Sequence, residues 1–105
     1  MTDAAERRFA AVAARFLEEP DVSEGTGFGK TPGLRTGGRI FAMLMRQSLV
    51  VKLPRERVDE LVARGAADRF ESGQGRPMKE WASLDVAGPE DWEAIAAEAH
   101  RFVGS

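Results

Sequence analysis

Two alternating segments joined by a short turn constrain this fold more than any other feature of the sequence. Residues 39–45 and 48–53 flank the Arg46-Gln47 pair. Period-two patterning over short runs is typical of paired strands, and the short connection predicts an antiparallel hairpin. Both faces of the hairpin are largely apolar, which predicts central strands covered on more than one side. In the first strand, Ile40, Ala42 and Leu44 are expected on one face, and Phe41, Met43 and Met45 on the other.

A helix is predicted directly after the hairpin. Pro54 suits the first position of a helix, where its missing N–H is not needed, and Gly65 suits the C-terminal end. Val58, Leu61 and Val62 lie between them at helical spacing. The segment from residue 38 to residue 65 therefore specifies an architecture, and it carries no reaction chemistry.

Amphipathic helices are also predicted near both ends of the chain. In residues 3–18, Asp3 caps the helix with Glu6 three positions later, and Pro20 ends it. Near the C-terminus, Gly88-Pro89 is expected to open the last helix. The two apolar stripes, Phe9, Val12, Ala13, Phe16 and Leu17 in the first helix and Trp92, Ile95, Ala96, Ala99, Phe102 and Val103 in the last, are expected to face the core.

Two further strands complete the predicted fold. Leu34-Arg35-Thr36 precedes the Gly37-Gly38 pair, which signals a tight turn, and residues 78–86 alternate as a last strand. In that last strand, Met78, Ala82, Leu84 and Val86 are expected on one face, and Lys79, Trp81 and Ser83 on the other. Residues 66–71 are expected only to return the chain. The predicted fold class is α+β, a single antiparallel sheet packed against helices in the order α-β-β-β-α-β-α, in one domain spanning residues 1–105.

Composition excludes several classes of function. The 105 residues include no cysteine and one histidine, His100, which we expect to be partly exposed in the last helix. Disulfides, thiolate catalysis and cysteine-ligated zinc are therefore excluded, and no histidine pair is present for a metal. No run approaches the roughly 18 apolar residues of a membrane span. The N-terminus lacks a signal-peptide pattern. We expect a cytoplasmic protein without cofactor, metal or membrane association.

Charge is distributed unevenly, although the net charge is only −2. Residues 28–57 carry seven basic side chains and one acidic side chain, for a net charge of +6. One interpretation is that the strands present their charges on a solvated face while the helices carry the acids. The other is a basic sheet surface that meets an anion.

A glycine-rich segment precedes the hairpin and invites comparison with phosphate-binding loops. A P-loop requires Gly-Lys followed by Ser or Thr, and a further glycine five positions before the glycine of that Gly-Lys pair. Gly29-Lys30-Thr31 supplies this ending, but Glu24 stands where the earlier glycine is required. We therefore interpret the segment as a short strand around Phe28 with glycine turns that start the sheet.

The order of several motifs resembles the N-terminal domain of TfoX-type competence regulators. Three motifs are similar to its Phe-Gly-Gly start, its Phe-Ala strand and its lysine-ending strand: Phe28-Gly29, the run from Gly38 to Ala42, and Leu49-Val50-Val51-Lys52. Lys30 stands in place of the second glycine of the start. Val51-Lys52-Leu53-Pro54 and Met78-Lys79-Glu80-Trp81 are similar to the related MmcQ/YjbR-like proteins. The resemblance covers about residues 5–103. It implies helices packed on one antiparallel sheet and a DNA-binding or regulatory role, and it implies no catalytic residue.

Six residues are candidates for a site that binds nucleic acid or another anion: Arg35, Arg39, Lys52, Arg76, Lys79 and Trp81. Basic side chains contact phosphates, and a tryptophan beside them can stack on a base. Structural interpretations stay open for each residue. Lys52 can form an ion pair with Glu56 or Asp85, Trp81 can pack under a helix, and Arg76 can be a solvated loop arginine.

We therefore predict a non-enzymatic binding domain, a monomer or homodimer, with DNA as the partner that the resemblance implies. The alternative is a protein-interaction module that docks a partner on an exposed apolar patch and binds no nucleic acid. A third interpretation is a small-molecule binder or enzyme that uses the cleft between sheet and helix. The absence of cysteine and of a second histidine argues against this third class.

Overall fold

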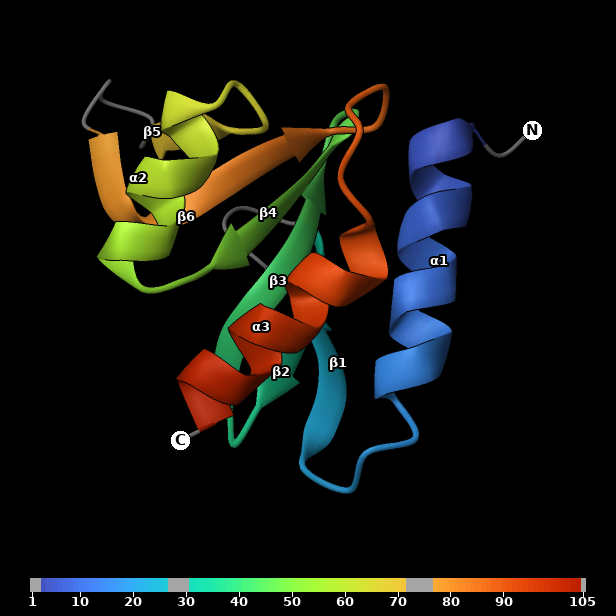
Figure 1. The fold of residues 1–105 in the computed structure, drawn as a ribbon. Coiled ribbons are helices and arrows are strands. Elements are labelled where there is room, and N and C mark those ends of the chain that lie inside the picture. Colours follow the sequence, from blue (N-terminus) through green and yellow to red (C-terminus); the bar gives the residue numbers. More distant parts are fainter. Residues whose placement is uncertain (1–2, 27–30, 72–76, 105) are drawn as a thin grey trace.

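Among the described residues, one antiparallel sheet with six strands forms the centre of the molecule (Figure 1). The computed structural model describes residues 3–26, 31–71 and 77–104. The sheet order is β1-β2-β3-β4-β6-β5, so β1 and β5 are its edges. The strands are β1 (Val22–Thr26), β2 (Pro32–Thr36), β3 (Arg39–Met45), β4 (Ser48–Lys52), β5 (Asp68–Glu71) and β6 (Pro77–Asp85); the helices are α1 (Ala4–Phe16), α2 (Arg55–Ala63) and α3 (Trp92–Gly104). The predicted α+β class is confirmed.

Both edge strands were absent from the predicted order, which becomes α-β-β-β-β-α-β-β-α. β5 lies where the sequence indicated only a return of the chain. The reason is physical: β1 reads VSEGT and β5 reads DRFE, so neither has a clear apolar alternation. The strand expected around Phe28 lies outside the described residues.

The predicted turn before β3 is confirmed. Gly37 and Gly38 have φ angles of +57° and +83°. Both angles fall in the left-handed region that glycine enters without steric cost, and two such residues in succession suit the tight connection between antiparallel strands. The Gly-Gly pair thus fixes where β2 ends and β3 begins.

All three helices pack against the same face of the sheet, which we call the helix face (Figure 1). Its core joins Phe9 and Phe16 of α1, Leu61 of α2 and Trp92 of α3 to the inward side chains of the strands. Fully burying one large apolar side chain contributes roughly 1.5–3 kcal/mol, so this core dominates the stability of the fold. The predicted layer arrangement is therefore correct.

The helix ends agree only partly with the prediction. Asp3 caps α1 as expected, since its Oδ1 accepts a hydrogen bond from the Glu6 N–H at 2.8 Å. The last helix begins at Trp92 and not at Gly88-Pro89, because the Asp91 Oδ1 accepts the Glu93 N–H at 2.9 Å and acts as the cap. Leu17 follows the end of α1 and is 36% exposed, so its predicted place in the core is wrong.

A bulge in β3 changes which residues share a face. Leu34 pairs with Ala42 while Arg35 pairs with Ile40, so Phe41 is the extra residue. Phe41 and Ala42 consequently both join the core on the helix face, whereas Ile40 lies on the other side of the sheet. The predicted grouping of Ile40 with Ala42, and of Phe41 with Met43, is wrong for this reason.

A second cluster of apolar residues lies on the face of the sheet away from the helices, which we call the opposite face. Met43, Val50 and Trp81 are buried there, with Ile40, Met45, Phe70 and Met78 packed against them. Every member of this cluster belongs to a strand. The predicted burial of the central strands on both faces is confirmed, although helices account for only one of them.

Candidate anion-binding site

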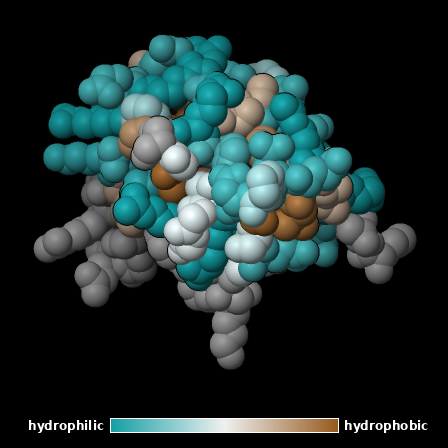
Figure 2. Space-filling model, turned by 90° about the horizontal axis from the view of Figure 1, so that it is seen from below, coloured by the Kyte–Doolittle hydropathy of each residue, from teal (hydrophilic) through white to brown (hydrophobic). Residues whose placement is uncertain are grey.

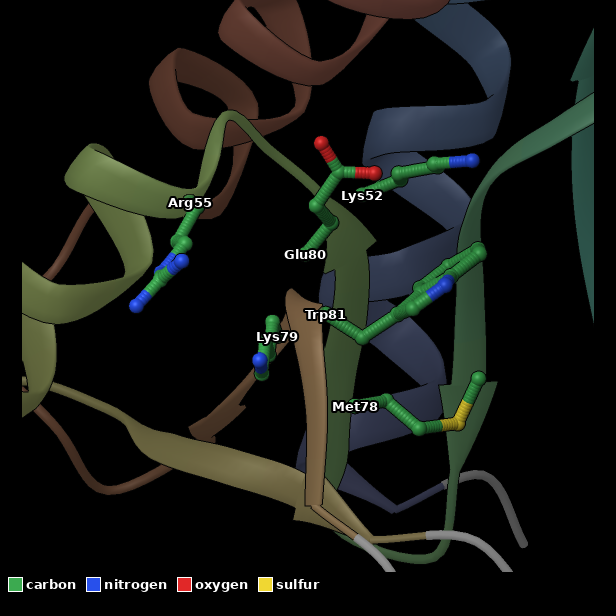
Figure 3. Close-up of a pocket in the computed structure, with 6 residues that line it drawn as sticks. All are labelled: Lys52, Arg55, Met78, Lys79, Glu80 and Trp81. Carbon is green, nitrogen blue, oxygen red and sulfur yellow. The ribbon is translucent and has the colours of Figure 1, made fainter.

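An irregular stretch of β6 builds the candidate site. Arg69 pairs with Ala82 and Glu71 pairs with Pro77. The chain therefore advances by two residues along β5 while it covers five residues along β6. The extra residues fall within 78–81, where strand alternation is therefore lost. Met78 and Trp81 extend to the same side of β6 (Figure 3) and both join the cluster on the opposite face. The predicted grouping of Met78 with Ala82 is wrong because of this irregularity.

A pocket of about 540 Å³ surrounds this part of β6 (Figure 3). Lys52 is the last residue of β4, and Arg55 is the first residue of α2. The other residues that line the pocket belong to β6. Figure 3 shows Lys52 on the side to which Trp81 extends, whereas Arg55 and Lys79 lie on the other side of the strand. The lining residues are Lys52, Arg55, Met78, Lys79, Glu80 and Trp81.

Lys52 and Trp81 are direct neighbours across β4 and β6, which the sheet register pairs with each other. The Lys52 Nζ lies 6.0 Å from the centroid of the Trp81 ring, at the outer limit of a cation–π contact. The predicted ion pair of Lys52 with Asp85 is not formed, because Asp85 pairs with Ser48 at the other end of β4. Within the described ranges Lys52 also forms no ion pair with Glu56.

Trp81 lines the pocket as a buried side chain and does not project into solvent. It is only 8% exposed and packs with Met43 and Val50 on the opposite face. The alternative prediction, that Trp81 packs under a helix, is right that the side chain is buried. It is wrong that a helix covers it, since no residue of the described helices belongs to this cluster. A ring buried to this extent cannot serve as an open platform on which a base stacks.

The positive charge of the pocket is poorly compensated. In the part of the chain that the structure describes, neither Lys52 nor Lys79 forms an ion pair. Arg55 Nε lies 3.9 Å from the Asp59 Oδ2, but the same carboxylate is bound more closely by Arg69 at 2.8 Å. Three cations therefore line the pocket beside a single acid, Glu80.

The structure brings together Lys52, Lys79 and Trp81 and places the other predicted site residues elsewhere. Arg35 lies on the opposite face on β2, two strands from β4, where its Nη1 donates to the Gly38 carbonyl at 3.1 Å. Arg39 pairs with the buried Thr36, and cross-strand partners share a face, so it belongs to the helix face. Arg76 lies outside the described residues. The six candidates therefore do not form one continuous surface.

Arg55 is the site residue that sequence reasoning missed. The sequence contained a signal for it. A basic side chain in the first turn of a helix interacts unfavourably with the helix dipole, so its presence there suggests a role other than stabilising the helix. Glu80 was missed as well, and nothing in its spacing distinguishes it from other solvated acids.

A separate polar cluster around His100 was not predicted. The His100 Nε2 lies 2.9 Å from the Asp21 Oδ2, which also accepts a hydrogen bond from the Thr36 hydroxyl. These contacts, first Thr36 and then His100, hold the pKa of Asp21 below its ordinary value. The His100 ring also packs beside Phe16 and Phe41, with centroids 5.6 and 5.3 Å away. Because the carboxylate sits between the hydroxyl and the imidazole, His100 is not placed to activate Thr36 as a nucleophile.

Comparison with known proteins finds no matching family model, no matching curated protein and no matching solved structure. The resemblance to TfoX-type and MmcQ/YjbR-like proteins therefore stays a prediction. Across residues 3–26, 31–71 and 77–104, no group of three or more His, Asp or Glu side chains is arranged to hold a metal ion. Over the same ranges, no helix has the length and apolar character needed to cross a membrane.

Proposed function

We propose that this domain is a non-enzymatic binding module that holds a nucleic acid strand through its phosphates at the β6 pocket. The observation that carries the proposal is the set of three cations, Lys52, Arg55 and Lys79, beside one acid. Lys52 and Lys79 form no ion pair in the described residues, and Arg55 has only a long contact with Asp59, so these cations are available to phosphate oxygens. Release of counterions from the nucleic acid favours the contact. The DNA-binding role implied by the family resemblance agrees with this proposal.

The arrangement of the cations favours a chain of phosphates over a single small anion. Lys52 lies on one side of β6 and Arg55 with Lys79 on the other (Figure 3). Cations separated by a strand do not converge on one phosphate, but they can contact successive phosphates of one backbone. Since Trp81 is buried, bases are not expected to stack there, and the binding should depend weakly on sequence.

The salt dependence of binding tests this function. Fluorescence anisotropy would follow a labelled oligonucleotide, single-stranded or duplex, across a range of salt concentrations. Each lost phosphate contact reduces the slope of log K against log salt by about 1. The double substitution Lys52→Ala/Lys79→Ala should therefore reduce the slope by about 2 and weaken binding at least tenfold at low salt.

A matched control removes the same charge elsewhere. Arg39→Ala/Arg101→Ala also deletes two exposed cations, one on the helix face and one on α3, outside the pocket. This pair should leave the slope nearly unchanged. The proposed function is wrong if the wild-type protein binds no oligonucleotide at low salt, or if the control pair weakens binding as much as the pocket pair. Thermal unfolding of each variant shows whether it is folded.

A further inference from the structure

Exposed apolar side chains are scarce in the ranges that the structure describes. Leu17, at 36% exposure, is the one exposed large hydrophobic side chain among the described residues. The side of the molecule seen in Figure 2 is mainly hydrophilic, with hydrophobic residues in small separate spots. A place where Leu17 joins other apolar groups is therefore informative about partners.

Leu17 lines a groove of about 430 Å³ between α1 and the first three strands of the sheet. The α1 side is formed by Ala10, Ala13 and Ala14 together with Leu17. These positions follow the spacing i, i+3, i+4 and i+7, so they form a second apolar stripe beside the stripe that faces the core. Leu44 of β3, which is 8% exposed, lies on the sheet side.

The groove lies at the part of the helix face with the least helical cover. α3 packs mainly on β3 and β4, and α2 packs on β6 and β5. The other edge strand, β1, has no comparable helix packed on it among the described elements. A fourth helix laid beside α1 would cover this end of the sheet, as helices do on edges that must be buried.

The rims of the groove are acidic on both sides. Glu6 of α1 borders one side and Glu24 of β1 borders the other. Both side chains are exposed, and neither forms an ion pair within the described ranges. Carboxylates in these positions repel the phosphates of nucleic acid and of anionic lipid, and they attract a partner with basic side chains.

From these features we propose that the groove docks an amphipathic helix of another protein, with an apolar stripe flanked by lysine or arginine. The stripe would pack on Ala10, Ala13, Ala14 and Leu17, and the basic flanks would pair with Glu6 and Glu24. This is the helix-in-groove mode of recognition, in which apolar anchors at helical spacing supply affinity and flanking charges supply orientation. The inference is independent of the β6 pocket, which takes a ligand of opposite charge.

Two peptides of about 16 residues, long enough for a helix, test this inference. Both carry leucines at i, i+3, i+4 and i+7; one has lysines on the flanks and the other has glutamates. Anisotropy should show that the lysine peptide binds at least tenfold more tightly. The double substitution Glu6→Lys/Glu24→Lys should reverse that preference, and Leu17→Asp should weaken binding of the preferred peptide. Glu56→Lys/Glu71→Lys, with the same change of charge on α2 and β5, should leave the preference unchanged.

Three outcomes would overturn the inference. The first is equal binding of the two peptides, and the second is a control pair that reverses the preference as the groove pair does. The third is self-association of the wild-type protein in sedimentation equilibrium that Glu24→Lys abolishes, because the groove would then hold a second copy of this chain. Reversal by the groove pair alone, in a protein that remains monomeric, supports the proposed partner.

Discussion

Arg46 has an unfavourable backbone conformation for a residue with a side chain. Its φ angle is +58°, the only positive value of a non-glycine residue in the described ranges, and it follows Met45 in the turn to Ser48. A left-handed conformation costs an L-residue about 1–2 kcal/mol. Arg46→Gly should therefore raise the free energy of unfolding by about 0.5–1 kcal/mol, and Arg46→Val should lower it by about 1 kcal/mol, as measured by urea denaturation. A valine variant more stable than the glycine variant would contradict this explanation of the turn.

Helices α2 and α3 are joined by a bidentate ion pair. The Arg57 Nε and Nη2 lie 2.8 and 3.0 Å from the two carboxylate oxygens of Glu98, and Arg57 also contacts Glu60. Both partners of the main pair are about three-quarters covered, with side-chain exposures of 26% and 28%. Planar, doubly hydrogen-bonded pairs are stronger than exposed point contacts.

Substitution of Arg57 should show that geometry and not charge alone matters here. Arg57→Ala should lower the free energy of unfolding by about 1–2 kcal/mol, and Arg57→Lys should recover less than half of that loss, because lysine cannot form the fork. Chemical denaturation measures both values, with Arg55→Ala as a control at a neighbouring exposed arginine. Full recovery by lysine would indicate that the paired geometry contributes little.

Asp21 contacts two other elements of the fold, and we expect it to make stability depend on pH. It lies between α1 and β1 and binds Thr36 of β2 and His100 of α3. Its pKa is lower in the folded protein than its ordinary value of 3.8. The contribution of Asp21 to stability is therefore present above the unfolded pKa and is lost as pH falls through the folded pKa.

The substitution Asp21→Asn should reveal this dependence. The variant should unfold more easily than the wild type at neutral pH. The difference should begin to shrink as the pH falls below the ordinary pKa of 3.8, where the carboxyl group of the unfolded chain is protonated, and should be lost as the pH falls through the lower pKa of the folded protein. Thermal unfolding across this pH range provides the measurement. Glu18→Gln is a suitable control, because Glu18 is exposed and forms no ion pair in the described part of the chain. A difference that stays constant from neutral to acid pH would rule out this role of the Asp21 charge.

At the scale of the molecule, the sequence predicted the layers of the fold better than the details of the strands. The three helices carry apolar stripes, so their existence followed from periodicity, whereas the packing of all three on one face of the sheet did not. Strand faces were predicted by alternation, which fails wherever a strand gains a residue. It failed at Phe41 and again over residues 78–81, because a bulge depends on the pairing partner and leaves no pattern in the single strand.

The candidate site was predictable only where its residues are close in the fold for simple reasons. Lys79 and Trp81 are near in sequence, and Lys52 ends the strand that pairs with β6, so all three line one pocket. The predicted placement of Lys79 on the same face as Trp81 is wrong, because the irregularity of β6 puts Lys79 on the other side of the strand (Figure 3). Arg35 and Arg39 were grouped with them on charge alone. Their positions depend on sheet order and on the bulge in β3, which composition does not record.

A nitrogen-15 NMR titration with a single-stranded oligonucleotide would locate the proposed binding of nucleic acid at the β6 pocket residue by residue. If nucleic acid binds there, amide shifts should concentrate on Lys52, Arg55 and residues 78–81, the Trp81 indole signal should move with them, and added salt should reverse these changes. Resonances of Ala13 and Leu17 in the acidic groove should stay in place. A spectrum that does not change at low salt, or shifts that concentrate on α1 and β1, would contradict the claim.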